Sequence, residues 1–489
     1  MRWALAIPLL LATCLPACSR TTSQADGGSA STPATLRIVS SPWACPAGSP
    51  ESARCNRVEV PADWNDPTAE EVVSLPVVVI PATTSDGRPD PLVVPAGGPG
   101  GSITDLAEHW SDPHRDIVLY DQRGTGHAEP KLDCPEREEA WLANLQRAAS
   151  FAVERASIVD ATVSCRHRLE ELGIDFDDYD TESNVRDLDA IRRALGYERW
   201  NILGISYGAR LTLAALRSSP DRIRSVILDS VSDVTTGGLA ASQESAERAL
   251  DQLVAGCAGS EACAGEHPDL GAEIGLVEQR YNATPIVIDV AVDDGSPPET
   301  FVITGADAMA GISQAMYDPA LIPLLPRIIG GLAAGDTSVI PELIRQNVAS
   351  HRTIAWAMNL SVNCADYAGL GAGADDAAIA DPGRFRTLLT ETTCADWPVE
   401  PTADDFNSPV TSDVPALVVA GQYDPVTPPA GSERVASRLT NSTFALWPNR
   451  GHGVTGDACA EDLMAAFLEH PELPLNLECL AAISGPTFV

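Results

Sequence analysis

The stretch Trp200–Arg210, which reads WNILGISYGAR, decides the fold. Its first half is apolar enough for a buried strand, and a helix is expected to begin at Tyr207 and run to Arg217. Between them, residues 204–208 form the pattern GxSxG, in which a sharp turn projects a serine hydroxyl above a sheet. A GxSxG alone is a weak signal, and an ordinary serine in a surface turn is the alternative. The strand, turn and helix around it make Ser206 a candidate nucleophile.

Strands and helices alternate on both sides of this turn. The predicted strands around it cover residues 72–80, 91–95, 116–120, 200–204 and 224–229. Pro76 suggests that the first of these is an edge strand or contains a bulge, because proline donates no ladder hydrogen bond. A helix is expected over 184–195, ended by Gly196. This alternation predicts a mostly parallel sheet with helices on both faces.

The pattern changes after about Val231. Alanine-rich helical stretches such as 242–255 follow, and the strand rhythm returns only at 414–420 and 442–446. The simplest organisation is one sheet domain interrupted by a largely helical insertion. We therefore divide the chain into a signal peptide (1–17), a flexible tether (18–35), the first part of the sheet domain (36–232), a helical cap (233–405) and the last part of the sheet domain (406–489).

The charge balance excludes several classes of partner. The chain of 489 residues has 68 acidic and 32 basic residues, a formal net charge of −36. Nucleic acids are bound through clustered Lys and Arg, and anionic lipid surfaces through polybasic segments. We therefore expect no nucleic-acid partner and no electrostatic binding to membranes.

The N-terminus predicts export. Arg2 precedes an apolar run from Trp3 to Leu15, which is typical of a secretory signal and short for a membrane span. Cleavage before Cys18 would resemble bacterial lipoprotein processing and would leave a lipid anchor on that cysteine. Pro16 is unusual in that motif, and the alternative is plain secretion without an anchor. The polar stretch 19–33 suits a flexible tether.

Ten further cysteines follow the signal segment. An even number in an exported chain favours disulfides over metal sites. Spacing alone does not determine the pairing, and we expect sequential neighbours to pair because this gives the shortest loops. The expected pairs are Cys45–Cys55, Cys134–Cys165, Cys257–Cys263, Cys364–Cys394 and Cys459–Cys479. A zinc site is disfavoured, because the chain has no CxxC pair and no histidine pair at ligand spacing. No metal and no cofactor are expected.

A serine nucleophile needs a base and an orienting carboxylate, which follow it in this chain order. Asp424 comes directly after the predicted strand 414–420, and His452 lies in a Gly-His-Gly turn after the next strand. We predict a catalytic triad of Ser206, Asp424 and His452. The fallback carboxylates are Asp413 and Asp457, neither of which ends a strand. His470, the other histidine after Asp424, is expected to be a solvated residue at a helix end.

Acyl transfer also needs donors for the developing oxyanion. One donor is expected to be the backbone N–H of Tyr207, directly after the nucleophile, and the other to come from a loop after an early strand. The glycine-rich run 96–102 fits that loop, and we choose Gly98 as its donor. The run lacks the Lys-Ser/Thr ending of a phosphate-binding loop.

With these residues in place, the chain closely resembles the α/β-hydrolase fold serine exopeptidases of the prolyl iminopeptidase and tripeptidyl aminopeptidase group. The matching pieces, in family order, are GGPGGS (97–102), DQRGTG (121–126), RDLDAIRRALG (186–196), GISYGAR (204–210), GQYDPVTP (421–428) and GHG (451–453). The resemblance covers residues 36–489, and its C-terminal stretch looks like the tripeptidyl aminopeptidase type. The chain departs from the family pattern at two positions: Ala96 stands where many members have a histidine, and Ala128 where they have a serine. Neither change affects the catalytic assignment. Asp121 and Arg123 are expected to hold loop geometry.

The resemblance implies an α/β-hydrolase fold and a peptide substrate with a free N-terminus. It also implies cap carboxylates that bind the substrate's α-amino group, and Glu244 and Glu247 on the first cap helix are candidates. In so acidic a protein, a solvated helix face is the alternative for both.

Three functions remain open. The leading one is an exported serine aminopeptidase that releases tripeptides or single residues through an acyl-enzyme. An esterase or lipase-like hydrolase using the same triad is the alternative, because fold alone does not separate the two. A non-catalytic binding protein on a hydrolase scaffold is disfavoured by the intact triad.

Overall fold

The computed structural model describes residues 39–84, 87–237, 239–368, 370, 383–385, 394–403 and 405–488. The predicted signal peptide and tether lie outside these residues. None of the helices in the described ranges is long and apolar enough to cross a membrane.

The described residues form a nine-stranded sheet and a separate two-stranded one. The strands of the large sheet are β1 (Val39–Pro42), β2 (Arg54–Pro61), β3 (Val72–Ile80), β4 (Leu92–Pro95), β5 (Ile117–Tyr120), β6 (Trp200–Ile205), β7 (Ile223–Asp229), β10 (Ala416–Gly421) and β11 (Ser442–Trp447). Their spatial order is β1-β2-β3-β5-β4-β6-β7-β10-β11. The pairings from β1 to β5 are antiparallel, and those from β5 to β11 are parallel. The predicted mostly parallel sheet is confirmed.

Helices cover both faces of this sheet. One face packs on α3 (Thr181–Leu195), α4 (Tyr207–Ser218) and α14 (Pro429–Arg438), and the other on α15 (Ala458–Glu469) and the 3-10 helix η1 (Thr104–His109). Successive residues of β10 alternate between the two cores, since Val418 belongs to the first and Val419 to the second. Burial on both faces explains why the sequence shows continuous apolar runs at these strands.

The prediction that Pro76 marks an edge strand or a bulge is wrong. Strand β3 lies inside the sheet between β2 and β5, and Pro76 pairs in regular register with Arg57. Pairing of β3 with β5 begins only at Val77, one residue later, and the Pro76 carbonyl accepts the N–H of Asp121 at 3.3 Å. The proline therefore stands just beyond the shorter partner strand, where its missing N–H interrupts no β3–β5 pair.

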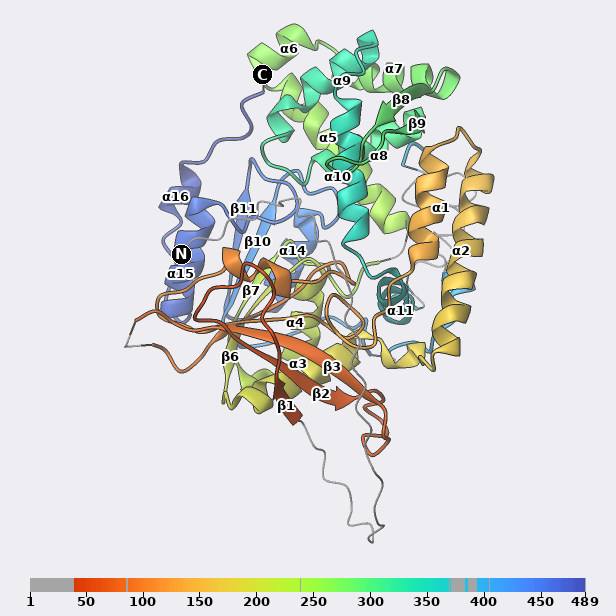
Figure 1. Cartoon of the computed structure of the whole chain (residues 1–489). Helices are drawn as coiled ribbons and strands as arrows, with labels where there is room; N and C mark the ends of the chain where they lie inside the picture. Colours follow the sequence, from red (N-terminus) through yellow and green to blue (C-terminus); the bar gives the residue numbers. More distant parts are fainter. Residues whose placement is uncertain are drawn as a thin grey trace.

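The chain between β7 and β10 forms most of the cap. Its elements are α5 (Leu239–Ala258), α6 (Glu261–Glu266), α7 (Leu270–Ala283), β8 (Ile286–Val290), β9 (Glu299–Ile303), α8 (Gly305–Ala315), η4 (Ile322–Leu324), α9 (Leu325–Ala334), α10 (Ile340–Arg352), α11 (Trp356–Asp366) and η5 (Cys394–Asp396). Figure 1 shows α5 to α10 gathered above the sheet, with α1 (Pro135–Leu145) and α2 (Phe151–Glu171) standing beside them.

The core of the cap and the core of the sheet domain each contain helices from outside the expected sequence range. The cap core contains Trp141, Leu145 and Ile158 from α1 and α2, which come before the nucleophile in the sequence. Conversely, α11 contributes to the core of the sheet domain. The remaining short elements are η2 (Phe176–Asp178), η3 (Pro220–Arg222) and α16 (Glu478–Ala481).

The predicted cysteine pairing is confirmed at every pair. The disulfides within the described residues are Cys45–Cys55, Cys134–Cys165, Cys257–Cys263, Cys364–Cys394 and Cys459–Cys479. Each joins segments close in sequence, so each stabilises a local loop. Pairs of this kind typically contribute about 2–4 kcal/mol to stability.

Candidate active site

Ser206 stands on a strained turn between β6 and α4. Its backbone has φ 58° and ψ −120°, a conformation that residues other than glycine rarely adopt. The flanking glycines permit the turn, because a side chain at Gly204 would overlap the start of α4 and one at Gly208 would overlap the carbonyl of Pro95. Backbone strain of this kind clusters at functional sites. Both glycines of the GxSxG pattern are thus required by close packing of strand and helix.

The turn opens into a cavity of about 510 Å³. Its walls come from the nucleophile turn, the glycine-rich loop, the segment after β7, helix α5, helix α11 and the start of α14. The residues that line it include Gly98, Ser206, Tyr207, Glu244, Thr427 and Arg434. The cavity lies between the sheet domain and the cap, where both can contribute side chains to a bound ligand.

Asp424 lies at the carboxyl end of β10 and is completely buried. One of its carboxylate oxygens accepts the backbone N–H groups of Val426 and Thr427 at 2.9 and 2.8 Å, and the other accepts the Thr427 hydroxyl at 2.7 Å. Burial raises the pKa of the carboxyl, but the charge of His452 and these hydrogen bonds outweigh burial and hold the pKa below its usual value. Asp424 is therefore ionised at neutral pH.

His452 contacts Asp424 directly. Its Nδ1 lies 2.9 Å from Asp424 Oδ2 and 3.1 Å from the Thr427 hydroxyl. An Nδ1–H that donates to the carboxylate leaves Nε2 free to accept a proton. Burial lowers the pKa of His452, but the negative charge of Asp424 outweighs burial and raises the pKa above its usual value. The pair thus has the geometry and charge of an oriented base.

The end of β7 ties the nucleophile turn to the histidine loop. The carbonyl of Asp229 accepts the N–H of Ser206 at 3.0 Å. Its buried carboxylate accepts the N–H groups of Val454 and Thr455, each at 2.9 Å. The Ser230 hydroxyl accepts the N–H of Gly453 at 2.9 Å. Asp229 therefore holds both Ser206 and the His452 loop, although these are far apart in the sequence, and Ser230 adds a second bond to the loop.

The two candidate oxyanion donors also meet at the cavity. Gly98 and Tyr207 both line it beside Ser206, and Tyr207 is the first residue of α4. Gly98 has φ 113°, which favours glycine. The glycine-rich loop is held from the side of α11, where the Asn359 amide donates to the carbonyl of Pro99 at 2.9 Å. The arrangement can present two N–H groups to one oxygen.

Asp121 and Arg123 hold loops, as the sequence suggested. The buried carboxylate of Asp121 accepts the N–H groups of Ile103 and Thr104, which follow the glycine-rich loop. Arg123 forms a fully buried pair with Asp187 at 2.7 Å.

The two candidate cap carboxylates are placed differently. Glu244 lines the cavity together with Ser206. Glu247 is absent from the cavity lining and faces Arg384, whose Nε lies 3.8 Å from its carboxylate. Burial raises the pKa of Glu247. Of the two, only Glu244 can reach a ligand in this cavity.

The fallback residues do not meet His452. Asp413 is exposed, and Asp457 caps α15 and pairs with Arg450 at 2.6 Å. His470 is exposed beside Glu472. Among these carboxylates, Asp424 alone contacts the histidine.

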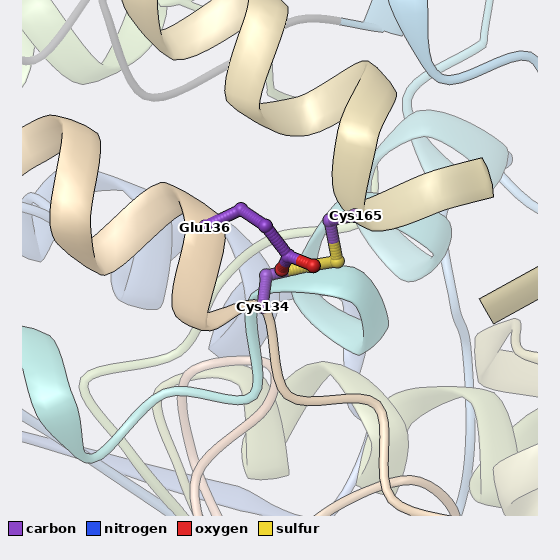
Figure 2. Close-up of side chains that lie close together, drawn as sticks. All are labelled: Cys134, Glu136 and Cys165. Carbon is purple, nitrogen blue, oxygen red and sulfur yellow. A yellow bond between two sulfur atoms is a disulfide. The ribbon is translucent and has the colours of Figure 1, made fainter. Parts of the chain in front are cut away.

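Cys134, Glu136 and Cys165 are the one group in the described residues with metal-ligand spacing. Figure 2 shows that the two sulfurs are joined in a disulfide, with the carboxylate of Glu136 beside it. Glu136 also pairs with Arg168 at 2.6 Å. A disulfide sulfur is not a thiolate ligand, so this cluster does not form a metal site.

Several contributors were not found from the sequence. Thr427 bonds to both Asp424 and His452, and the DPVTP motif that contains it is a signal that could have indicated it. Arg248 of α5 donates to the backbone carbonyls of Gln422 and Asp424, which joins the cap to the loop of the acid. No local pattern predicts that contact, because the two segments are 176 residues apart.

Comparisons with known proteins agree with the fold and with a hydrolase. Residues 90–256 match the alpha/beta hydrolase fold family, and residues 383–479 match a family of TAP-like proteins. Serine protease Hip1 of Mycobacterium tuberculosis is 26% identical over 456 residues, covering 86% of this chain and 85% of that protein. Carboxylesterase B of the same species is 27% identical over 463 residues, covering 88% and 86%. Tripeptidyl aminopeptidase of Streptomyces lividans is 26% identical over 466 residues, covering 86% and 82%.

Among solved structures, a proline iminopeptidase from Mycobacterium smegmatis matches at 16% identity with a TM-score of 0.39, covering 85% of this chain and 98% of that one. The family matches and the sequence relatives, together with the sheet and its nucleophile turn, identify the chain as a serine hydrolase of the α/β-hydrolase fold, related to the tripeptidyl aminopeptidase group of serine exopeptidases.

Proposed function

We propose that this chain is an exported serine aminopeptidase that releases tripeptides or single residues from peptide N-termini. The observation that carries the proposal is the carboxylate of Glu244 in the same cavity as Ser206. Within the described residues it forms no ion pair and accepts no hydrogen bond. The ammonium group of a free N-terminus would supply the missing partner. Glu244 is exposed, so a peptide with a blocked N-terminus would lack this ion pair and bind less well.

In the proposed reaction, the Ser206 hydroxyl attacks the carbonyl carbon of the scissile peptide bond. His452 Nε2 takes the hydroxyl proton, while Asp424 holds Nδ1–H and stabilises the imidazolium. The N–H groups of Gly98 and Tyr207 donate to the oxygen on which negative charge develops. His452 then gives the proton to the departing amine, and the carbon–nitrogen bond breaks. Water hydrolyses the acyl-enzyme by the same steps in reverse.

Two features support export. The segment 1–17 has the pattern of a secretory signal, and disulfides such as those in this chain persist in oxidising compartments. A lipid on Cys18 would hold the enzyme at a membrane surface. Mass spectrometry of the mature protein from its native envelope tests this, since an unmodified N-terminus would exclude the anchor.

A second candidate function is hydrolysis of small esters. A relative named carboxylesterase B supports it, and the same nucleophile and base would serve. An esterase has no need of a carboxylate that pairs with an ammonium group. The role of Glu244 therefore separates the two functions.

The test compares a tripeptide amide with a free amine, its N-acetylated form and a short-chain nitrophenyl ester. We expect the free peptide to be preferred and Glu244→Gln to raise its KM about 10- to 100-fold, which corresponds to the loss of one charged hydrogen bond. Glu247→Gln is the matched control, because it makes the same change on the same helix outside the cavity. Equal turnover of free and acetylated peptides would contradict the proposal, and ester turnover without peptide turnover would favour the esterase.

A further inference from the structure

The cavity beside Ser206 carries an unusual set of charges for so acidic a protein. Three guanidinium groups line it, those of Arg210, Arg248 and Arg434, against two carboxylates, those of Asp233 and Glu244. A cavity in a chain with net charge −36 would be expected to be acidic. The distribution of partners among these five residues shows which charges are available to a ligand.

Two of the three arginines are already occupied. Arg210 donates to the buried carboxylate of Asp366 at 3.2 Å. Arg248 donates to the backbone carbonyls of Gln422 and Asp424. Both guanidinium groups therefore hold parts of the protein.

Arg434 differs from them. Its side chain is 47% exposed, and its nearest acidic partner is Asp233 at 3.8 Å, beyond hydrogen-bond distance. Asp233 is buried and is already bound by Arg438, which donates to both of its oxygens at 3.3 and 3.4 Å. Arg434 donates no side-chain hydrogen bond to any residue in the described part of the chain. Its positive charge is thus in excess of what the fold neutralises.

Glu244 is the complementary case. It lines the same cavity on the cap side, from α5, while Arg434 lies on α14 of the sheet domain. No ion pair joins the two residues. Within the described residues Glu244 has no charged partner, and Arg434 has only its 3.8 Å contact with Asp233, a carboxylate that Arg438 also binds. The cavity therefore offers one separated negative charge and one separated positive charge to whatever binds beside Ser206.

We propose that Arg434 is a specificity-determining residue that binds a carboxylate of the peptide substrate while Glu244 binds its α-ammonium group. This inference rests on the proposed aminopeptidase function and names its substrate class. The carboxylate belongs either to an acidic side chain near the N-terminus or to the C-terminus of a short peptide. Arginine suits both, because its planar guanidinium can bind a carboxylate through two parallel hydrogen bonds.

The experiment measures kcat/KM for matched pairs of peptides. One series carries Glu or Gln, in turn, at each of the first three positions of a C-terminally amidated peptide. A second pair compares a neutral tetrapeptide as free acid and as amide. We expect an acidic form to be preferred about fivefold in one arm, which is the upper end of the range for exposed ion pairs. The arm that shows the preference identifies which carboxylate binds.

Arg434→Gln is the test variant, and the readout is the ratio of acidic to neutral substrate within one protein. In Arg434→Gln we expect that ratio to fall to about one, mainly because KM for the acidic substrate rises. In Arg434→Glu we expect the neutral substrate to be preferred. Labelling with a fluorophosphonate probe reports the folded, reactive fraction of each variant. Arg345→Gln is the matched control, because Arg345 lies on α10, pairs with Glu342 on the same helix and does not line the cavity. Its ratio should match that of the unaltered protein.

Three results would overturn the inference. If the unaltered protein cleaves free-amine peptides with equal kcat/KM for acidic and neutral members of every pair, Arg434 has no role in specificity and the aminopeptidase function stands. The same holds if a preference exists but survives Arg434→Gln. If no free-amine peptide is cleaved and only esters are, both the inference and the proposed function fall.

Discussion

Replacing Asp424 with asparagine is the sharpest test of the proposed triad. The carboxylate accepts four hydrogen bonds, three from Val426 and Thr427 and one from His452. Asparagine keeps one oxygen for the two backbone N–H groups and presents an NH₂ group to the histidine. Nδ1 must then accept rather than donate, so the ring proton moves to Nε2. An imidazole that carries its proton on Nε2 is unable to take one from Ser206.

The expected loss follows from that change of tautomer. We expect kcat to fall by about 10⁴, which corresponds to about 5 kcal/mol of lost transition-state stabilisation. The pH profile should also change. Activity requires neutral His452 and falls as the pH drops through its pKa, which Asp424 raises. Without that negative charge the pKa falls, so the acidic limb of the residual activity should move to lower pH.

The assay is kcat/KM on a free-amine peptide amide from pH 4 to 9, with circular dichroism as a check of folding. Asp413→Asn is the matched control, because Asp413 is the exposed fallback carboxylate and its replacement should change neither rate nor profile. A loss of less than about tenfold for Asp424→Asn, or an acidic limb that stays in place, would refute the assignment of Asp424 as the orienting acid.

Three further predictions concern the nucleophile, the cap contact and a disulfide. Ser206→Ala should lose activity by several orders of magnitude and keep its thermal midpoint; substantial residual hydrolysis would mean that another group is the nucleophile. Gly451→Ala should destabilise by about 1–3 kcal/mol in urea unfolding, because a methyl group there would overlap the carbonyl of Met316 from the cap, whereas Gly265→Ala, with nothing nearby, should not. Replacing both Cys134 and Cys165, which are 31 residues apart, with alanine should lower the free energy of unfolding by about 3–4 kcal/mol. An unchanged unfolding midpoint would show that this disulfide does not stabilise the fold.

Local signals predicted much of the sheet domain. The GxSxG turn, the apolar strands and the Gly196 helix end are all local, since each depends on residues a few positions apart. The disulfides were predictable for a related reason, because short loops between sequential cysteines are the easiest to close. The edge-strand interpretation of Pro76 failed because it depends on the length of the neighbouring strand, which the local sequence does not contain.

The local sequence does not predict which of the two candidate cap carboxylates lines the cavity. Glu244 and Glu247 are three residues apart on α5, and both fit the expected pattern. Only the packing of α5 against the sheet domain turns Glu244 into the cavity and leaves Glu247 facing Arg384. The packing of α1 and α2 into the cap core was also not predictable from the local sequence, because it depends on which apolar helix faces pack together.

By itself, the sequence determined the nucleophile turn, the order of the catalytic candidates and the acidic, export-compatible character of the chain, and it favoured the cysteine pairing that the structure shows. These depend on residue chemistry and short spacings. The tertiary structure decided that Asp424 is the carboxylate in contact with His452, and that β7 holds both the nucleophile turn and the histidine loop. It also decided that Arg434 and Glu244 carry the available charges of the cavity. These facts depend on contacts between segments up to hundreds of residues apart, which only the packed chain brings together.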